Sequence, residues 1–150
     1  PIRLDLTMRL ARALGVLDHL ELTAPVPSSD EVLRLGHTHE YIDAVRRCGV
    51  VSHGEDLQHG LGSPDVPTFP DMHQASARIV GGTVEAARAV WSGEADHAFN
   101  PAGGLHHAMP NNASGFCVYN DVSIAISSLL EQGVERVAYV DIDVHHGDVG

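Results

Sequence analysis

Near its carboxyl end the chain reads Arg136-Val137-Ala138-Tyr139-Val140-Asp141-Ile142-Asp143-Val144-His145-His146-Gly147-Asp148. The run begins with apolar and β-branched residues, which is typical of a strand buried on both faces of a parallel sheet. Its second half alternates acidic with apolar residues, so Asp141, Asp143 and His145 should project from one side of the strand. Three possible metal ligands would then converge at the carboxyl end of a strand, where open α/β sheets place their active sites.

Carboxylate oxygen and neutral imidazole nitrogen are both suitable zinc ligands, and a catalytic zinc usually has three protein ligands and one water. The tripeptide Asp143-Val144-His145 is nevertheless a weak signal by itself. A strand that carries polar residues into a surface loop has the same pattern, and the tripeptide alone favours that interpretation.

A second pair of histidines lies in Gly103-Gly104-Leu105-His106-His107, a glycine-rich loop that follows the short segment His97-Ala98-Phe99-Asn100. We expect that segment to be a neighbouring strand. Since parallel neighbours end side by side, the two histidine loops should face each other, one with metal ligands and the other with a general base and acid. Asp141 and Asp148 are candidates to bond the second nitrogen of these histidines. On spacing alone, a solvated histidine pair is the alternative.

The remaining pattern predicts helices joined by long loops. The first expected helix runs from the start of the chain to near Gly15. A short second helix begins at Glu31, and a third follows a cap at Thr38. The fourth runs from Asp71 to Trp91 and the fifth from Cys117 to Gln132. Two adjacent glycines, Gly81 and Gly82, interrupt the fourth helix and indicate close packing against another element. The segment from His53 to Pro70 should be an irregular and functional loop. Strand, helix and strand in this order predict a parallel βαβ unit.

Composition limits the class of function. Of the 150 residues, 43% are apolar, which is enough to bury one core. Nine basic against twenty acidic residues give a net charge of −11, which argues against direct binding to nucleic acid or anionic membranes. We recognise neither a signal peptide nor an apolar run of the roughly 18 residues that span a bilayer. Two cysteines, Cys48 and Cys117, are too few for a disulfide framework, so we expect a cytoplasmic protein.

Several blocks of the chain, taken in order, resemble the zinc-dependent histone deacetylase family, and within it the bacterial acetoin-utilisation type. They are the opening helix and residues 37–42, 60–67, 100–108, 114–121 and 141–148. Any single block could arise by chance, but all of them in this order are a strong signal.

This resemblance implies an α/β protein with the three-layer arginase/deacetylase-like fold around a parallel sheet. Residues 1–150 would be the N-terminal part of a single deacetylase domain, with the C-terminal half absent. That half would hold the third zinc ligand, an aspartate, and a tyrosine that donates to the oxyanion, so the 150 residues alone are expected to be inactive. The family motif continues Asp-Gly, whereas Val149 follows Asp148 here.

The resemblance also implies the roles of individual residues. Asp143 and His145 would be two zinc ligands, and His107 the main general base and acid, with His106 beside it. Asp148 and Asp141 would be the respective partners of His107 and His106.

For the substrate, the resemblance implies that Gly115 and Phe116 line the narrow tunnel around the acyl-lysine chain. Asp65 would be the rim carboxylate that accepts hydrogen bonds from the substrate backbone. Besides Zn²⁺, the family binds K⁺ near the position of Asp141, where the carbonyls of Asp143 and His145 could contribute.

The expected activity is zinc-dependent hydrolysis of acetyl-lysine amides on proteins, with release of acetate. A close alternative is an acetylpolyamine amidohydrolase, which would prefer an acidic tunnel mouth, and the net charge does not decide between them. An alternative of another class is a non-catalytic fragment or interaction module. The expected partner is an acetylated protein or a small acetylamide, and the sequence leaves the oligomeric state open.

Overall fold

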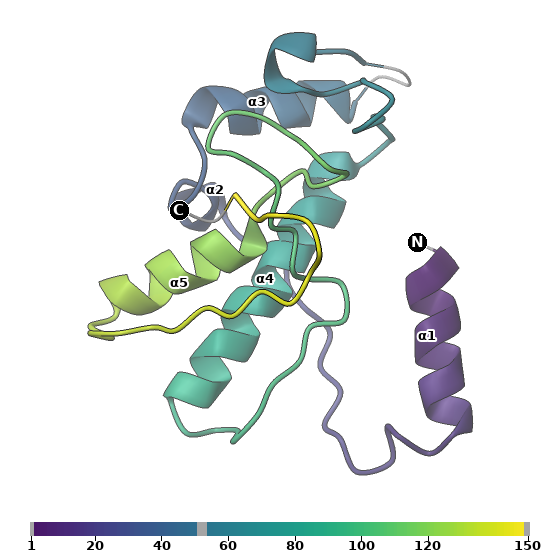
Figure 1. Cartoon of the computed structure of the whole chain (residues 1–150), viewed down its shortest axis with the longest axis vertical. Coiled ribbons are helices and arrows are strands. Elements are labelled where there is room, and N and C mark those ends of the chain that lie inside the picture. The colour runs from purple at the N-terminus through teal and green to yellow at the C-terminus, as the bar shows by residue number, and fades with distance from the viewer. Residues whose placement is uncertain (1, 51–53, 149–150) are drawn as a thin grey trace.

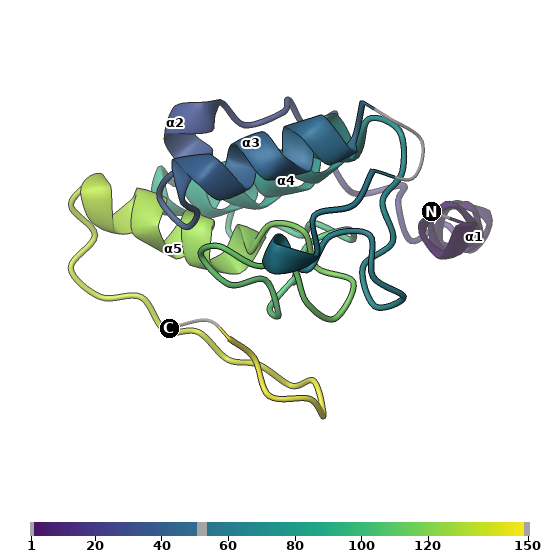
Figure 2. The ribbon, with the colours of Figure 1, turned by 90° about the horizontal axis from the view of Figure 1, so that it is seen from above.

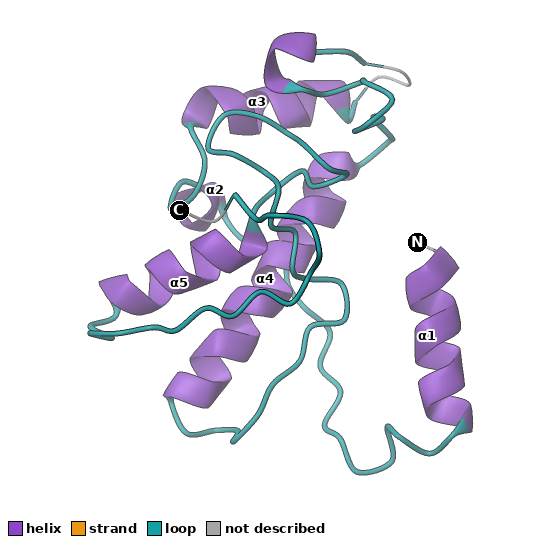
Figure 3. Ribbon diagram, in the orientation of Figure 1, coloured by secondary structure: helices purple, strands orange, loops and turns teal. Residues whose placement is uncertain are grey.

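The computed structural model describes residues 2–50 and 54–148 of the chain (Figure 1). Its helices are α1 (Ile2–Ala13), α2 (Asp30–Leu33), α3 (His39–Cys48), the 3-10 helix η1 (Leu57–His59), α4 (Met72–Trp91) and α5 (Asp121–Glu131). Long irregular segments join them (Figure 3). His53, where the functional loop was expected to begin, and Val149, where the sequence departs from the family motif, lie outside the described residues.

Helix α1 stands apart from the other helices, as Figures 1 and 2 both show. It ends at Ala13, close to the expected end at Gly15, and none of its residues is buried. Leu6 and Leu10 are more than half exposed. Tertiary packing therefore contributes little to α1 among the described residues.

Side-chain caps define the starts of α2 and α3, and the predicted Thr38 cap of α3 is confirmed. The Ser29 hydroxyl accepts a hydrogen bond from the N–H of Val32, and the Thr38 hydroxyl accepts one from Tyr41. Such caps satisfy backbone donors that the first helical turn leaves free.

The core lies between α3, α4 and α5, which Figure 2 shows as one group with the segment after α5 along its underside. Its largest fully buried apolar side chains are Tyr41, Tyr119, Leu33, Ile42, Leu61, Met72 and Ile124. Burying each of these contributes about 1.5 to 3 kcal/mol. The core therefore fixes the end of the loop that leads into α5, where Val118 and Tyr119 are buried.

The glycine pair in α4 does pack closely against other segments. A Cβ atom at Gly81 would overlap the carbonyl oxygen of Val26, and one at Gly82 would lie 2.9 Å from the Nδ2 atom of Asn100. The prediction that close packing explains the two glycines is confirmed.

The predicted parallel sheet is not confirmed. Among the described residues the only β pairings are isolated bridges, at Asp56 with Leu61, Met109 with Asn112 and Ser114 with Cys117. The expected strands at residues 97–100 and 136–144 are irregular, because a strand needs hydrogen bonds from a neighbour and neither segment has one there. The apolar side chains of Ile142 and Val144 accordingly remain exposed. The βαβ unit predicted from the sequence is therefore absent from the described residues.

The prediction that the last helix begins at Cys117 was wrong by four residues, because α5 begins at Asp121. Cys117 exchanges backbone hydrogen bonds with Ser114 in a turn, and Asn120 supplies the cap by accepting a hydrogen bond from the N–H of Ser123. No helix in the described part of the chain is long and apolar enough to cross a bilayer.

Candidate active site

Two adjacent histidines in the loop between α4 and α5 form the centre of the candidate site. His106 is buried and His107 is half-buried, and their ring centroids lie 4.1 Å apart. The N–H of His106 donates to the carbonyl of Gly104 at 3.0 Å, in a turn for which Gly104 adopts a φ of +88°. Glycine adopts such a conformation without the usual steric cost. The turn holds the two imidazoles side by side.

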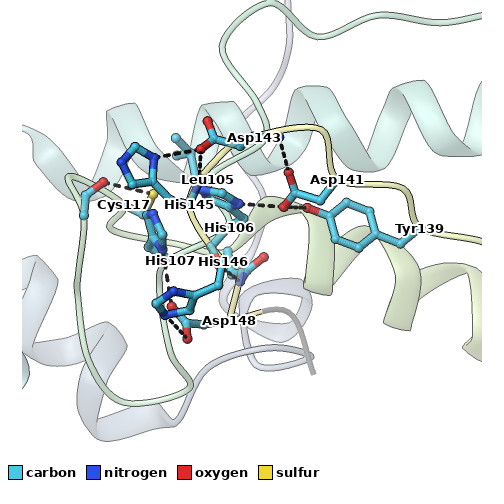
Figure 4. A network of polar contacts seen from close by, with 12 residues as sticks. Leu105, His106, His107, Cys117, Tyr139, Asp141, Asp143, His145, His146 and Asp148 are labelled. Carbon is cyan, nitrogen blue, oxygen red and sulfur yellow. Dashed lines mark hydrogen bonds and ion pairs between the residues drawn. The ribbon is translucent and has the colours of Figure 1, made fainter.

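The segment after α5 brings a carboxylate to each imidazole (Figure 4). Oδ2 of Asp141 lies 2.6 Å from Nδ1 of His106, and Oδ2 of Asp148 lies 3.3 Å from Nδ1 of His107. The N–H of Asp148 also donates to the carbonyl of His106 at 2.7 Å. These are the pairings that the family resemblance implied. A carboxylate at Nδ1 favours a proton there and leaves Nε2 free to accept one.

Asp141 accepts hydrogen bonds from three directions. The Tyr139 hydroxyl donates to it at 2.6 Å, the N–H of Asp143 donates at 2.9 Å, and His106 is the third partner. These contacts, with the tyrosine hydroxyl first among them, hold the pKa of the Asp141 carboxyl well below its usual range. Partial burial and the same contact raise the pKa of Tyr139 to about 12. Asp141 is therefore a carboxylate at neutral pH.

The two expected zinc ligands contact each other. Oδ1 of Asp143 accepts hydrogen bonds from the backbone N–H and the Nδ1 atom of His145, both at 2.8 Å, and these lower the pKa of Asp143. The His145 ring lies 6.1 Å from the ring of His107, so the two histidine loops face each other as expected.

Asp143 and His145 fit part of a zinc site. Their carboxylate oxygen and imidazole nitrogen lie 2.8 Å apart, a little closer than the roughly 3.3 Å that two ligands of a tetrahedral zinc keep. Both side chains are at least half exposed and so accessible to an ion. The described residues contain no group of three histidine, cysteine, aspartate or glutamate side chains placed to hold a metal. At most two of the three protein ligands that a catalytic zinc usually has could therefore come from the described residues, and Asp143 and His145 are the candidates.

The three residues expected to contact substrate lie close together. Oδ2 of Asp65 accepts a hydrogen bond from the N–H of Gly115 at 2.7 Å. Gly115 has a φ of +53° and packs so closely on the His107 ring that a Cβ atom there would overlap it. Phe116 is 73% exposed. Gly115 thus joins the loop of Asp65 to the histidine pair, while Phe116 is largely exposed.

A pocket of about 390 Å³ lies between α4 and α5; neither His106 nor His107 is in its lining, but Gly103 and Gly104 of the same loop are. Its lining includes Thr83, Val90, Phe99, Asp121 and Leu129.

Sequence reasoning gave no role to several residues that contact the site. Tyr139 donates to Asp141, and Asn120 and Asp121 bond the loop that carries the histidines. An asparagine followed by an aspartate before an apolar run is a helix-start signal, and it could have identified the last two. Tyr139 carries no such signal.

Comparison with known proteins gives a consistent result. Residues 1–149 match the model of the histone deacetylase domain. The chain is 43% identical over 148 residues to the acetoin utilization protein AcuC of Bacillus subtilis (strain 168), covering 97% of this chain and 38% of that protein. It is 42% identical over 149 residues to AcuC of Staphylococcus xylosus, covering 98% and 39%. The chain thus spans about two fifths of the length of these relatives.

Solved structures agree with the sequence comparisons. A crystal structure of an HDAC homolog complexed with SAHA has a TM-score of 0.84 and 33% sequence identity, covering 93% of this chain and 38% of that one. A crystal structure of an HDAC homolog from Aquifex aeolicus has a TM-score of 0.81 and 35% identity, with the same coverage.

Proposed function

This chain belongs to the histone deacetylase family, and on that premise we propose that its protein hydrolyses acetyl-lysine amides on other proteins with the help of zinc, releasing acetate. The 93% of the chain that aligns with the two HDAC homologues has a similar fold, with TM-scores of 0.84 and 0.81. The single observation that supports the activity most is the pair of histidine–carboxylate contacts, His106 with Asp141 and His107 with Asp148. Paired contacts of this kind are suited to proton transfer in amide hydrolysis.

In this proposal His107 moves the proton. Its Nδ1 atom faces Asp148, so its Nε2 atom is free to take a proton from the attacking water and later return it to the leaving amine. Asp148 would orient the ring and stabilise its positive charge between these two steps. His106, fixed by Asp141 and buried beside His107, would add a second imidazole near the reacting atoms.

Asp143 and His145 would hold the zinc ion, together with a ligand outside the described residues. When bound, zinc polarises a carbonyl and lowers the pKa of bound water. A potassium ion near Asp141 and the carbonyls of Asp143 and His145 is part of the same proposal. Residues 1–150 would be the N-terminal part of one deacetylase domain, inactive alone, in a cytoplasmic protein.

Substrate contacts are proposed for the residues around Gly115. Its close approach to His107 would let the acyl chain pass beside the reacting histidine. Phe116 would supply an aromatic wall, and Asp65 would accept hydrogen bonds from the substrate backbone with the oxygen that Gly115 does not occupy.

The test is an assay of the purified protein that contains this chain, with an acetyl-lysine peptide and with acetylspermidine, before and after removal of metal by a chelator. We expect turnover of the peptide, loss of turnover with chelator, and recovery with zinc. Preference for acetylspermidine would instead identify an acetylpolyamine amidohydrolase. No turnover of either compound with zinc present would contradict the proposed function.

A further inference from the structure

Two adjacent residues at the start of α5, Asn120 and Asp121, hold the loop that carries the histidine pair. We propose that they are positioning residues, which fix His106 and His107 against their carboxylates. This inference rests on the proposed function for its catalytic meaning, while the positioning itself can be measured without any substrate.

Asp121 holds the loop just before the histidines. Its side chain is fully buried, and its Oδ1 atom accepts a hydrogen bond from the N–H of Leu105 at 2.7 Å. Its Oδ2 atom accepts one from the N–H of Gly104 at 3.0 Å. A buried carboxylate is costly unless donors satisfy it, so these amides are held strongly.

A directed chain of hydrogen bonds orients the Asp121 carboxylate from behind. The Nδ2 atom of Asn100 donates to the Thr83 hydroxyl at 2.8 Å, and that hydroxyl donates to Oδ2 of Asp121. The fit is close, because a Cβ atom at Gly103 would lie 2.5 Å from the same carboxylate oxygen. The carboxylate therefore has little freedom to move away from the loop.

Asn120 holds the loop on the other side of the histidines. Its Nδ2 atom donates to the carbonyl of Ala108 at 3.0 Å and contacts that of His106 at 3.5 Å. Its own backbone N–H donates at 2.9 Å to Nε2 of the buried His37. Residues 104–108 are thus bound at both flanks by two consecutive residues of one helix start.

Helix capping explains only part of this arrangement. The Oδ1 atom of Asn120 does cap α5, by accepting from the N–H of Ser123 at 3.0 Å. The Asp121 carboxylate, in contrast, bonds the loop and Thr83. An acidic residue in the first turn of a helix interacts favourably with the helix dipole even without such contacts. The dipole therefore does not explain why Asp121 bonds the loop.

The first variant is Asp121→Asn, which keeps the shape of the side chain and puts an NH₂ group in place of one acceptor. Whichever oxygen position the NH₂ group takes, it would face a backbone N–H, that of Leu105 or that of Gly104. Two donors cannot bond each other, so the loop should shift. We expect kcat to fall at least about tenfold with little change in KM, since a displacement of about 1 Å can cost a hundredfold. Asp30→Asn is the matched control: it makes the same change in the first turn of α2, where Asp30 pairs with Arg46. It should lower the melting temperature and leave kcat unchanged.

NMR of the imidazole nitrogens separates this inference from the proposed function. In the unchanged protein, His106 and His107 should each carry the proton on Nδ1, and Asp121→Asn should shift these signals whether or not any acetylamide is hydrolysed. If Asp121→Asn does not fold, Thr83→Val decides, because it removes only the hydroxyl behind the carboxylate and should shift the same signals in the same direction. Unaltered imidazole signals in a folded Asp121→Asn protein would overturn the inference. If that variant does not fold, unaltered signals in Thr83→Val would do so.

Discussion

Nδ1 of His106 lies 2.6 Å from Oδ2 of Asp141, a carboxylate 35 positions further along the chain. The contact joins the loop between α4 and α5 to the segment after α5. The Asp141 carboxylate also accepts hydrogen bonds from the Tyr139 hydroxyl and from the N–H of Asp143, so one side chain bonds residues of both histidine loops.

Asp141→Asn should therefore lower turnover of an acetyl-lysine peptide by about a hundredfold, the lower end of what a positioned histidine contributes to proton transfer. The amide keeps the size of the side chain but bears no charge to stabilise a protonated His106. Tyr139→Phe is the control, because it removes one donor to Asp141 and keeps the carboxylate, so its effect should be smaller. Equal losses in the two variants would show that the carboxylate charge is not what matters.

Asp143→Asn and His107→Ala should separate metal binding from proton transfer. Removing a residue that only bonds a ligand weakens metal affinity about 10- to 100-fold, so replacing the proposed ligand Asp143 should weaken zinc binding at least as much. His107→Ala should keep its zinc and lose at least about a hundredfold in turnover. Metal content after dialysis, measured by mass spectrometry, distinguishes the two. A His107→Ala protein without zinc that regains full activity when zinc is added would mean that the roles of the two histidine motifs are reversed.

The helices could be predicted from the sequence because their signals are local. Thr38 caps α3 and Gly93 follows α4, and both are visible as residue types at fixed offsets. The parallel sheet is not confirmed among the described residues, since a strand depends on a partner that its own sequence does not name. The apolar run at residues 136–140 has strand character but no hydrogen-bonded neighbour there.

The site was predicted in part. The strand-end pattern already made Asp141 and Asp148 candidates to bond the two histidines, and the family resemblance assigned Asp141 to His106 and Asp148 to His107, which are the contacts observed. The contacts of Asp121 with Gly104 and Leu105 were missed, because a buried polar contact between distant residues leaves no periodic pattern.

His37 should make the protein sensitive to acid. Its ring is buried, and burial lowers its pKa to about 4, while the ordinary value is 6.5. The unfolded chain therefore binds a proton before the folded one does, so stability is present above about pH 6.5 and is lost as the pH falls toward 4. The loss should approach about 3 kcal/mol. Denaturant unfolding at pH 7 and at pH 4.5 measures it.

The variant His37→Asn should reduce this dependence on pH, although it will also lower stability at pH 7 by removing the acceptor for Asn120. The exposed His97 provides the control, since His97→Gln should leave the slope as it is. If His37→Asn lost as much stability between the two pH values as the unchanged protein, another group would be responsible.

Gly115→Ala should damage catalysis more than stability. Gly115 has a φ of +53°, and a Cβ atom there would overlap the ring of His107, so the ring must move for alanine to fit. The left-handed backbone by itself costs alanine about 1 kcal/mol.

Gly93→Ala is the control for Gly115→Ala, because it has that backbone cost without the overlap. Gly93 has a φ of +77°, and nothing lies within 4 Å of its Cβ position. The left-handed backbone should lower the melting temperature of both variants by a similar amount. Only Gly115→Ala should lose about ten- to a hundredfold in kcat, because misplacing a reacting group by about 1 Å is enough for such a loss. Turnover of Gly115→Ala within twofold of Gly93→Ala would mean that the His107 ring moves aside without consequence, and its observed position would then not be the one that catalysis needs.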